Sequence, residues 1–330
     1  MFGRAACWSP KPDRLLAAAA FVCSISSPGM AQTYPERPIR MILAVAAGGG
    51  QDTVARAMTP KLSTLLGANI IIDNRPGGGG NIGVGVARQA SPDGYTLLMI
   101  SSSNVIQPIV HGSPYDLQRD FAPVAQLVNQ PYLLAVTPSL PVKSVADLIS
   151  YARANAGKMN YGSAGSGSLT HLAAELFRDQ ARFDAVHVPY KGTGPVYPDL
   201  IAGRLQFAFA TIVSAQPHVR NNRLRALAVS SAKRAQAAPD VPTVAEAGLP
   251  GYAVTQWYGV LAPARTPRGA VATLNKAFVG AIEDPELGKH LASDGAEAAP
   301  SSPQEFTAHI KAEHSRWSRI IERAGLRKAE

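Results

Sequence analysis

Two glycine-rich loops in this 330-residue chain have the composition and placement to bind a small anion. Residues 48–52 (G-G-G-Q-D) join an apolar, strand-like run to a helical pattern, and residues 162–168 (G-S-A-G-S-G-S) do the same further along. Backbone N–H groups in such a loop, with the positive end of the following helix, can receive a carboxylate without a cationic side chain. Ordinary flexible turns are the alternative. Two such loops in separate units favour an anion clamp.

Other residues near these loops have a structural and a functional interpretation. Asp52 is expected chiefly to cap its helix, with direct ligand contact as the alternative. Residues 187–192 (H-V-P-Y-K-G) lie at a strand end, where Tyr190 and Lys191 could meet a ligand. His187 is expected to be a packed or partly exposed histidine. For Lys191, the alternative to a ligand contact is a solvated surface charge.

A third glycine stretch, residues 78–83, matches the G-x-G-x-x-G pattern of dinucleotide-binding proteins and lies between a strand and a helix. The next strand should then end in an acid that holds the ribose. It ends in Ile100 followed by three serines. A turn with unusual backbone angles is therefore favoured, and no nucleotide cofactor is expected.

The sequence offers little for catalysis. It contains no G-x-S-x-G nucleophile motif, and the serines have no evident base partner. His171 and Glu175 share a helical face, but the H-E-x-x-H spacing and a third ligand are missing. We expect no catalytic residue, no metal site and no cofactor.

The elements that position these loops follow an alternating pattern. Apolar runs with strand character alternate with amphipathic helical stretches, which predicts parallel sheets covered by helices and ligand loops at the strands' carboxyl ends. The expected strands are residues 39–45, 68–73, 95–100, 132–136, 159–161, 185–188, 205–210, 224–229 and 257–262. The expected helices are residues 52–66, 81–88, 144–155, 169–179, 195–202, 268–282, 285–294 and 303–324. The last helix places Phe306, Ile310, Trp317 and Ile321 at core spacing.

The first 31 residues have the pattern of a cleaved export signal. Three basic residues precede a short apolar run at 15–25, and small residues lead to a cleavage position after Ala31. The run is too short to cross a bilayer, which needs about 20 residues. Both cysteines lie in this leader, so disulfides and thiol chemistry are not expected in the mature protein.

The charge balance favours no nucleic-acid partner. The net charge is +9, but lysine and arginine are scattered and form no block suited to a phosphate backbone. The basic balance can attract anionic ligands or can serve solubility.

Short motifs along the chain are typical of one receptor family. The sequence resembles the Bug-type solute receptors of tripartite tricarboxylate transporters, which are exported substrate-binding proteins. The likeness rests on Y-P-E-R-P-I at 34–39, A-G-G at 47–49 with Asp52, N-R-P-G at 74–77, N-I-G at 81–83, P-D-G-Y-T-L at 92–97, Y-D at 115–116, D-F at 120–121, G-S-A-G at 162–165, V-P-Y-K-G at 188–192, D-V-P-T at 240–243 and W-Y-G at 257–259.

The resemblance implies a type II periplasmic-binding-protein fold, with two α/β lobes joined by two crossover strands around a ligand cleft. The first lobe would comprise residues 32–134 and 229–330, and the second residues 135–228. The ligand would be a small carboxylate, a di- or tricarboxylate or an aromatic acid. Carried onto this sequence, with the loop analysis above, the binding residues would be Ala47, Gly48, Gly49, Asp52, Ser102, Gly165, Ser166, Ser168, Thr170, Tyr190, Gly192 and Thr211.

Two departures from the family pattern bear on the site. Many relatives have prolines where this chain has Ala44 and Ala46, so the first loop loses preorganisation. Many also carry an acid where this chain has Thr211, and a hydroxyl there does not provide a charge for an ammonium group.

The sequence therefore predicts a monomeric periplasmic receptor that captures a carboxylate and delivers it to membrane transporter subunits. One alternative is a ligand-sensing partner of a membrane sensor kinase. The other is a hydrolase or transferase that uses the Ser166 or Ser168 hydroxyl.

Overall fold

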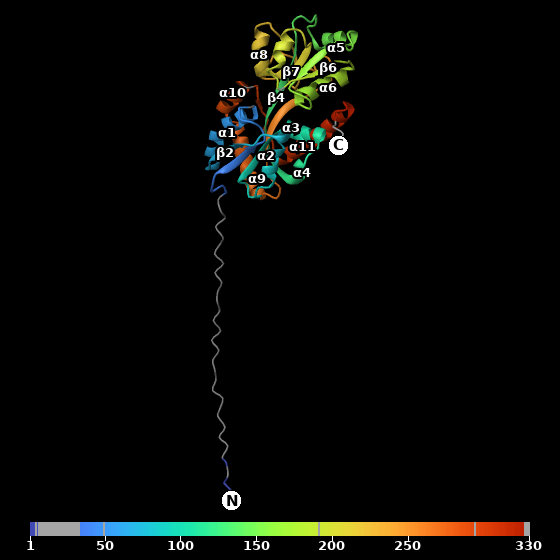
Figure 1. Ribbon diagram of the computed structural model, residues 1–330. Helices are drawn as coiled ribbons and strands as arrows, with labels where there is room; N and C mark the ends of the chain where they lie inside the picture. Colours follow the sequence, from blue (N-terminus) through green and yellow to red (C-terminus); the bar gives the residue numbers. More distant parts are fainter. Residues whose placement is uncertain (4, 6–33, 49, 191, 294, 327–330) are drawn as a thin grey trace. The chain divides into compact units, whose positions relative to one another are not determined.

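The computed structural model describes residues 1–3, 5, 34–48, 50–190, 192–293 and 295–326 (Figure 1). Residue 4 and residues 6–31 of the predicted leader, its cleavage position, Gly49 and Lys191 lie outside the residues described. Residues 34–330 form one compact unit, described here by itself. It contains two sheets that share one long strand, β4 (Phe121–Val136).

The first sheet has the order β2-β1-β3-β9-β4. Strand β1 (Ile39–Leu43) lies parallel to β2 (Ile70–Asn74) and to β3 (Thr96–Ser101). Strand β9 (Thr255–Pro263) runs antiparallel between β3 and β4, and the short β10 (Glu297–Ala298) pairs with β4. The carboxyl ends of β1 and β3 lead directly into the loops that the sequence marks as ligand-binding.

The second sheet is built around the other half of β4. There β4 pairs antiparallel with β7 (Phe207–Thr211) and β8 (Arg225–Val229). Strand β5 (Asn160–Ser163) lies parallel to β7 and to β6 (Val186–Pro189). The second glycine-rich loop follows β5 directly, so it also lies at a carboxyl end.

Helices cover both sheets (Figure 1). Helix α11 buries Phe306, Ile310, Trp317 and Ile321, which confirms the predicted core face of the last helix. The helices are α1 (Gly50–Leu66), α2 (Asn81–Arg88), α3 (Ser102–His111), α4 (Leu117–Asp120), α5 (Val145–Ala154), α6 (Leu169–Ala181), α7 (Val196–Ile201), α8 (Ile212–Arg220), α9 (Arg268–Ile282), α10 (Pro285–Ser293) and α11 (Pro303–Arg323), with a short 3-10 turn η1 (Gly78–Gly80).

Two chain segments cross between the sheets, as the fold prediction requires. Strand β4 pairs with β9 as far as Pro131 and with β7 from Tyr132 onward. The return segment lies beside it, since Ser230 donates its N–H to the Tyr132 carbonyl at 2.8 Å, and Val254 donates to the Ser230 carbonyl at 2.7 Å. The predicted two-lobe α/β fold is thus confirmed, while the residue boundaries of the lobes stay a prediction.

Helix α3 was absent from the sequence expectations, and it contains a proline. Pro108 has no N–H to donate to the carbonyl of Asn104, four residues earlier. The Tyr115 hydroxyl donates to that carbonyl instead, at 3.3 Å. A tertiary contact therefore replaces the missing helical hydrogen bond and allows α3 to run through the proline.

Candidate functional site

A hollow of about 500 Å³ lies at the carboxyl ends of the first sheet. Two glycine loops, the first turns of α3 and strand β9 surround it. Its described lining is Ala44, Val45, Ala46, Gly50, Gln51, Gly77, Gly79, Gly80, Ser101, Ser103, Asn104, Gln107, Gln256 and Tyr258. All of these side chains are neutral alkyl, amide, hydroxyl or phenol groups, so polar recognition there depends on dipoles.

The first glycine loop is held in place by Asp52. This carboxylate is only 3% exposed and accepts the Gly48 N–H at 2.9 Å, Arg56 Nε at 2.9 Å and Asn74 Nδ2 at 3.0 Å. The hydrogen bond from Arg56, with those from Gly48 and Asn74, holds the pKa of Asp52 below its usual value against the opposing effect of burial. The expectation that Asp52 caps the helix is wrong, because α1 begins at Gly50 and Asp52 lies within its first turn, where it fixes the preceding loop through Gly48.

The predicted first-lobe residues lie beside the hollow, and their immediate neighbours line it. Ala47 and Gly48 are exposed at the loop, and Gly48 has a φ of +84° that favours glycine. Ser102 is fully buried, and its hydroxyl donates to Gln256 Oε1 at 2.6 Å. Ala46, Gly50, Gln51, Ser101 and Ser103 form the surface itself.

The G-x-G-x-x-G stretch is part of this hollow. Residues Gly77 to Gly80 all have positive φ, which confirms the prediction of a turn with unusual backbone angles. A Cβ on Gly80 would lie 3.2 Å from Asn104 Nδ2 and 3.5 Å from the Ala44 side chain. The glycines therefore let this turn approach α3 and the first loop closely.

Two hydroxyls orient the amide of Gln256. Its Oε1 accepts from Ser102 at 2.6 Å and from Tyr132 at 3.4 Å. Because the oxygen is engaged, the amide NH2 is the end of Gln256 that can donate to a ligand in the hollow. Tyr132 lies where β4 changes sheets, so this network connects the hollow to a crossover strand.

The second glycine-rich loop forms a compact set of hydrogen bonds. Gly165 and Gly167 have φ values of +130° and +74°. Thr170 Oγ1 accepts the Ala164 N–H at 3.0 Å, and Ser168 Oγ accepts the His171 N–H at 3.2 Å as the cap of α6. Ser166 is exposed at the tip.

The strand-end segment at 187–192 packs against this loop. Tyr190 donates its N–H to the Ser163 carbonyl at 3.1 Å, and Gly192 donates to the Ala164 carbonyl at 3.2 Å. The Tyr190 hydroxyl donates to Asp199, and burial together with that carboxylate raises the pKa of Tyr190 to about 12. The structure thus brings together six of the predicted residues: Gly165, Ser166, Ser168, Thr170, Tyr190 and Gly192.

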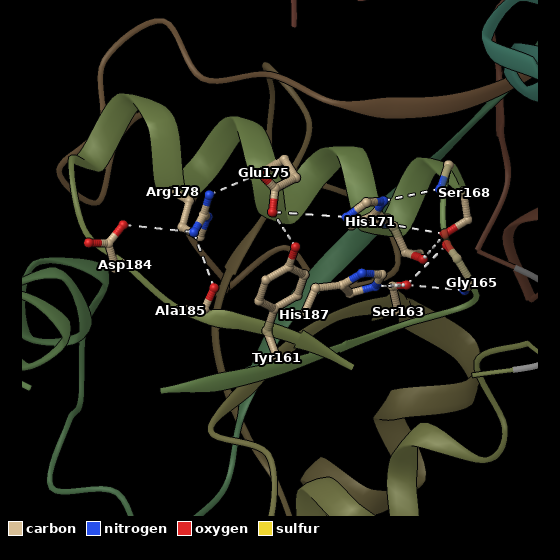
Figure 2. Close-up of polar contacts among 12 residues, drawn as sticks. Tyr161, Ser163, Gly165, Ser168, His171, Glu175, Arg178, Asp184, Ala185 and His187 are labelled. Carbon is tan, nitrogen blue, oxygen red and sulfur yellow. Dashed lines mark hydrogen bonds and ion pairs between the residues drawn. The ribbon is translucent and has the colours of Figure 1, made fainter. Parts of the chain in front are cut away.

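Two histidines lie beside the loop (Figure 2). His171 Nδ1 accepts the Gly167 N–H at 3.1 Å, and His187 Nε2 lies 2.7 Å from Ser163 Oγ. That same Ser163 hydroxyl accepts the Gly165 N–H at 3.1 Å. Burial lowers the pKa of each imidazole to about 4, helped by the charge of Arg178 for His171 and of His171 for His187.

The expectation that the serines lack a base partner is wrong for Ser163. Its contact with His187 was not visible in the sequence, because the two residues belong to adjacent strands, β5 and β6. Ser163 is only 1% exposed and has its hydroxyl engaged with the Gly165 backbone. The pair therefore supports the loop, with its oxygen turned away from solvent.

Thr211 lies apart from the hollow of the first lobe. It ends β7, opposite Tyr132 of β4, and its hydroxyl forms a hydrogen bond with Ser214, which also bonds Tyr197. The second glycine-rich loop instead contacts α3, where Gln107 Nε2 donates to the Gly167 carbonyl at 3.5 Å.

Several lining residues were missed in the sequence. Gln51, Asn104, Gln107, Gln256 and Tyr258 belong to the hollow but were not singled out there. Only their neighbours in the sequence could have indicated two of them, since Gln51 follows the first glycine run and Tyr258 lies in the W-Y-G motif.

Comparisons with known proteins agree with this geometry. The sequence model described as "Tripartite tricarboxylate transporter family receptor" matches residues 54–326. The chain belongs to this receptor family. BugT of Bordetella pertussis is 32% identical over 306 residues, covering 92% of this receptor and 94% of BugT. A protein of Pseudomonas sp. strain P51 from the tcbD-tcbE intergenic region is 36% identical over 312 residues, covering 93% of each chain.

Solved structures show the same two-lobe fold. Rpa4515 of R. palustris, solved with adipate, has 36% identity and a TM-score of 0.76, covering 88% of this receptor and 98% of that chain. MatC of Rhodopseudomonas palustris, solved with bound malate, has 32% identity and a TM-score of 0.72, covering 87% and 100%.

The family assignment makes this chain a substrate-binding receptor and not an enzyme. The hydrolase alternative for Ser166 and Ser168 is thereby set aside. Within the described residues, no cluster of three or more metal-ligating side chains occurs. Among those residues no helix is both long and apolar enough to cross a bilayer.

Proposed function

We propose that this receptor binds a small carboxylate between the hollow of the first lobe and the glycine-rich loop of the second, and delivers it to a tripartite tricarboxylate transporter. The observation that carries this proposal is the neutral, donor-bearing lining of the hollow. The predicted twelve binding residues and the lobe boundaries after residues 134 and 228 are part of the proposal.

Neutral donors suit an anion that must be released again. A carboxylate gains charge-assisted hydrogen bonds from amide, hydroxyl and backbone N–H groups without forming a buried ion pair. The described lining supplies such groups at Ser103, Asn104, Gln107 and Gln256. Breaking the bound state then requires no separation of opposite buried charges.

The relatives support the ligand class. The two solved R. palustris proteins were captured with adipate and malate, both small dicarboxylates. We infer the same class here, with an aromatic acid as the other member of the proposed range. We also propose a periplasmic location for the mature receptor, which the expected leader with cleavage after Ala31 supports. A monomeric state is part of the same proposal.

A thermal-shift screen of small carboxylates with the purified protein tests the proposal. A ligand at about a hundredfold excess over its dissociation constant adds roughly 2.7 kcal/mol of stability, which raises the melting temperature measurably. Neutral amides of the same acids serve as matched controls, because they keep the carbon skeleton and lack the charge. A folded protein whose melting temperature no carboxylate raises would contradict the proposed function.

A further inference from the structure

The hollow of the first lobe continues beyond the loops. A second hollow of about 290 Å³ is lined by Gly78, Gly79, Asn81, Gln107, His111 and Gly112. Gly79 and Gln107 line both hollows, so the two adjoin. We call the combined feature the α3 groove.

One face of helix α3 forms the length of this groove. Ser103, Gln107 and His111 are spaced four residues apart, which places them on one side of the helix. At 1.5 Å per residue, the distance along the helix from Ser103 to His111 is about 12 Å. The groove is therefore elongated, with its hydroxyl and amide end at Ser103 and its imidazole end at His111.

His111 differs chemically from the rest of the groove. Among the described lining residues of both hollows it carries the imidazole, whose ring N–H can donate a hydrogen bond to a carboxylate. It lies in the last turn of α3, where the negative end of the helix dipole favours a cation. It is also exposed, so a ligand can reach it.

We propose that the α3 groove selects an elongated diacid, with one carboxylate at the glycine-loop end and the second at His111. This inference rests on the proposed function and deepens it. It assigns the spacing of the two carboxylates in the ligand and a residue that binds the distal one. Asn81, which also lines the imidazole end, supplies a second donor there.

The dimensions favour a chain of about four methylenes or a para-substituted ring. Extended chains advance about 1.2 Å per bond, so the outermost carboxylate oxygens lie roughly 8 Å apart in adipate and roughly 6 Å apart in succinate. Donors that line the groove meet these oxygens obliquely, so each hydrogen bond of about 3 Å adds roughly 2 Å along the groove. Adipate therefore covers the distance of about 12 Å, and succinate, at roughly 10 Å, reaches only one end.

Titration calorimetry with adipate, hexanoate and succinate tests this assignment. Hexanoate has the carbon chain of adipate without the distal carboxylate. The unaltered receptor should bind adipate about tenfold more tightly than hexanoate. His111→Gln keeps a side-chain donor but removes the imidazole, and it should reduce that ratio to about twofold while leaving hexanoate binding unchanged. His290→Gln, on α10 and outside the groove, is the matched control and should preserve the ratio.

The outcomes separate the two proposals. Hexanoate binding together with an adipate-to-hexanoate ratio that His111→Gln does not alter would overturn the groove assignment and leave the receptor function standing. Tighter binding of succinate than of adipate would overturn the groove assignment as well. Failure of all three acids to bind would overturn the groove assignment, and the receptor function is overturned with it only when the wider carboxylate screen also finds no ligand.

Discussion

The imidazole rings of His171 and His187 stack with their centroids 3.8 Å apart and their planes 12° from parallel. Each ring also meets one polar group of the second glycine-rich loop, through Gly167 and Ser163. A neutral pair suits this arrangement, because His171 Nδ1 must accept a hydrogen bond and two adjacent positive charges would repel. The loop is thus supported by two histidines that stay uncharged.

The histidine pair predicts that the receptor loses folding stability in acid. The pKa of each imidazole is about 4 in the folded protein, below the value near 6.5 expected when unfolded, so stability is full above pH 6.5 and is lost as pH falls toward 4. Protonation of His171 lowers the free energy of unfolding by at most about 3 kcal/mol. Glu175, 3.9 Å from His171, and nearby Arg178 also face the pair.

Urea unfolding between pH 4 and 7.5 measures this loss. The control is His171→Gln, which keeps an acceptor for the Gly167 N–H but does not titrate, and its stability should depend less steeply on pH. Equal slopes for the variant and the unaltered protein would contradict the prediction.

Two glycines in helix α2 should respond oppositely to alanine. A Cβ on Gly83 would lie 2.8 Å from Ala44 Cα and 2.8 Å from the Arg75 carbonyl oxygen, whereas a Cβ on Gly85 would meet nothing within 4 Å. Gly83→Ala should cost about 1–3 kcal/mol and weaken ligand binding, because it displaces the Ala44 wall of the hollow. Gly85→Ala should add up to about 1 kcal/mol. Chemical denaturation measures the free energy of unfolding of both variants. A Gly83→Ala variant as stable as the unaltered protein would refute the proposed close packing.

The glycine-rich loops should matter more for binding than the charge of Lys191. Gly48→Val forces a β-branched residue into a φ of +84°, and Ser166→Glu places a negative charge at the proposed anion site. Each should weaken carboxylate binding at least about tenfold, while Lys191→Gln should weaken it less than about threefold. Calorimetry on the three variants compares them. If Lys191→Gln weakened carboxylate binding more than the two loop variants, the prediction would be contradicted and the charge of Lys191 would dominate binding.

Thr211 should set the preference between acids and amino acids. Its hydroxyl bonds Ser214 and provides no carboxylate for an ammonium group, so succinate should bind more tightly than aspartate. Thr211→Asp should narrow that difference, whereas the neutral Thr211→Asn should not. Competition calorimetry with the two ligands measures it. Tighter binding of aspartate by the unaltered receptor would refute this role.

Much of the fold could be predicted because its apolar periodicity is strong. Helix α9 occupies residues 268–282 and α2 residues 81–88, as expected. Three of the missed segments contain proline: Pro108 in α3, Pro217 in α8, and Pro123 and Pro131 in the part of β4 before the expected strand at 132–136. The short α4 and β10 were missed as well and contain none. Proline is a local signal against both helix and strand, and only tertiary contacts such as Tyr115 to Asn104 override it.

The two glycine-rich loops of the site could be predicted from the sequence, but most of the side chains that line the hollow could not. Glycine runs at 48–50 and 162–167 marked the two loops, because their composition is local information. Gln107 and Gln256 come from α3 and β9, and their place beside those loops depends on long-range pairing. The contact of Ser163 with His187 likewise follows from the register of β5 with β6.

The strand order β3-β9-β4 has a consequence for how the protein acquires its structure. Strand β9 fills the place between β3 and β4, yet the chain reaches it only after the whole second sheet, and Tyr258 meets Gln130 across 128 residues. Until β9 arrives, β3 and β4 each have an open hydrogen-bonding edge in the middle of the first sheet. Pairing over such separations is slow. A chain shortened before Thr255 should therefore aggregate through those edges, because the first sheet is complete only when β9 has joined it.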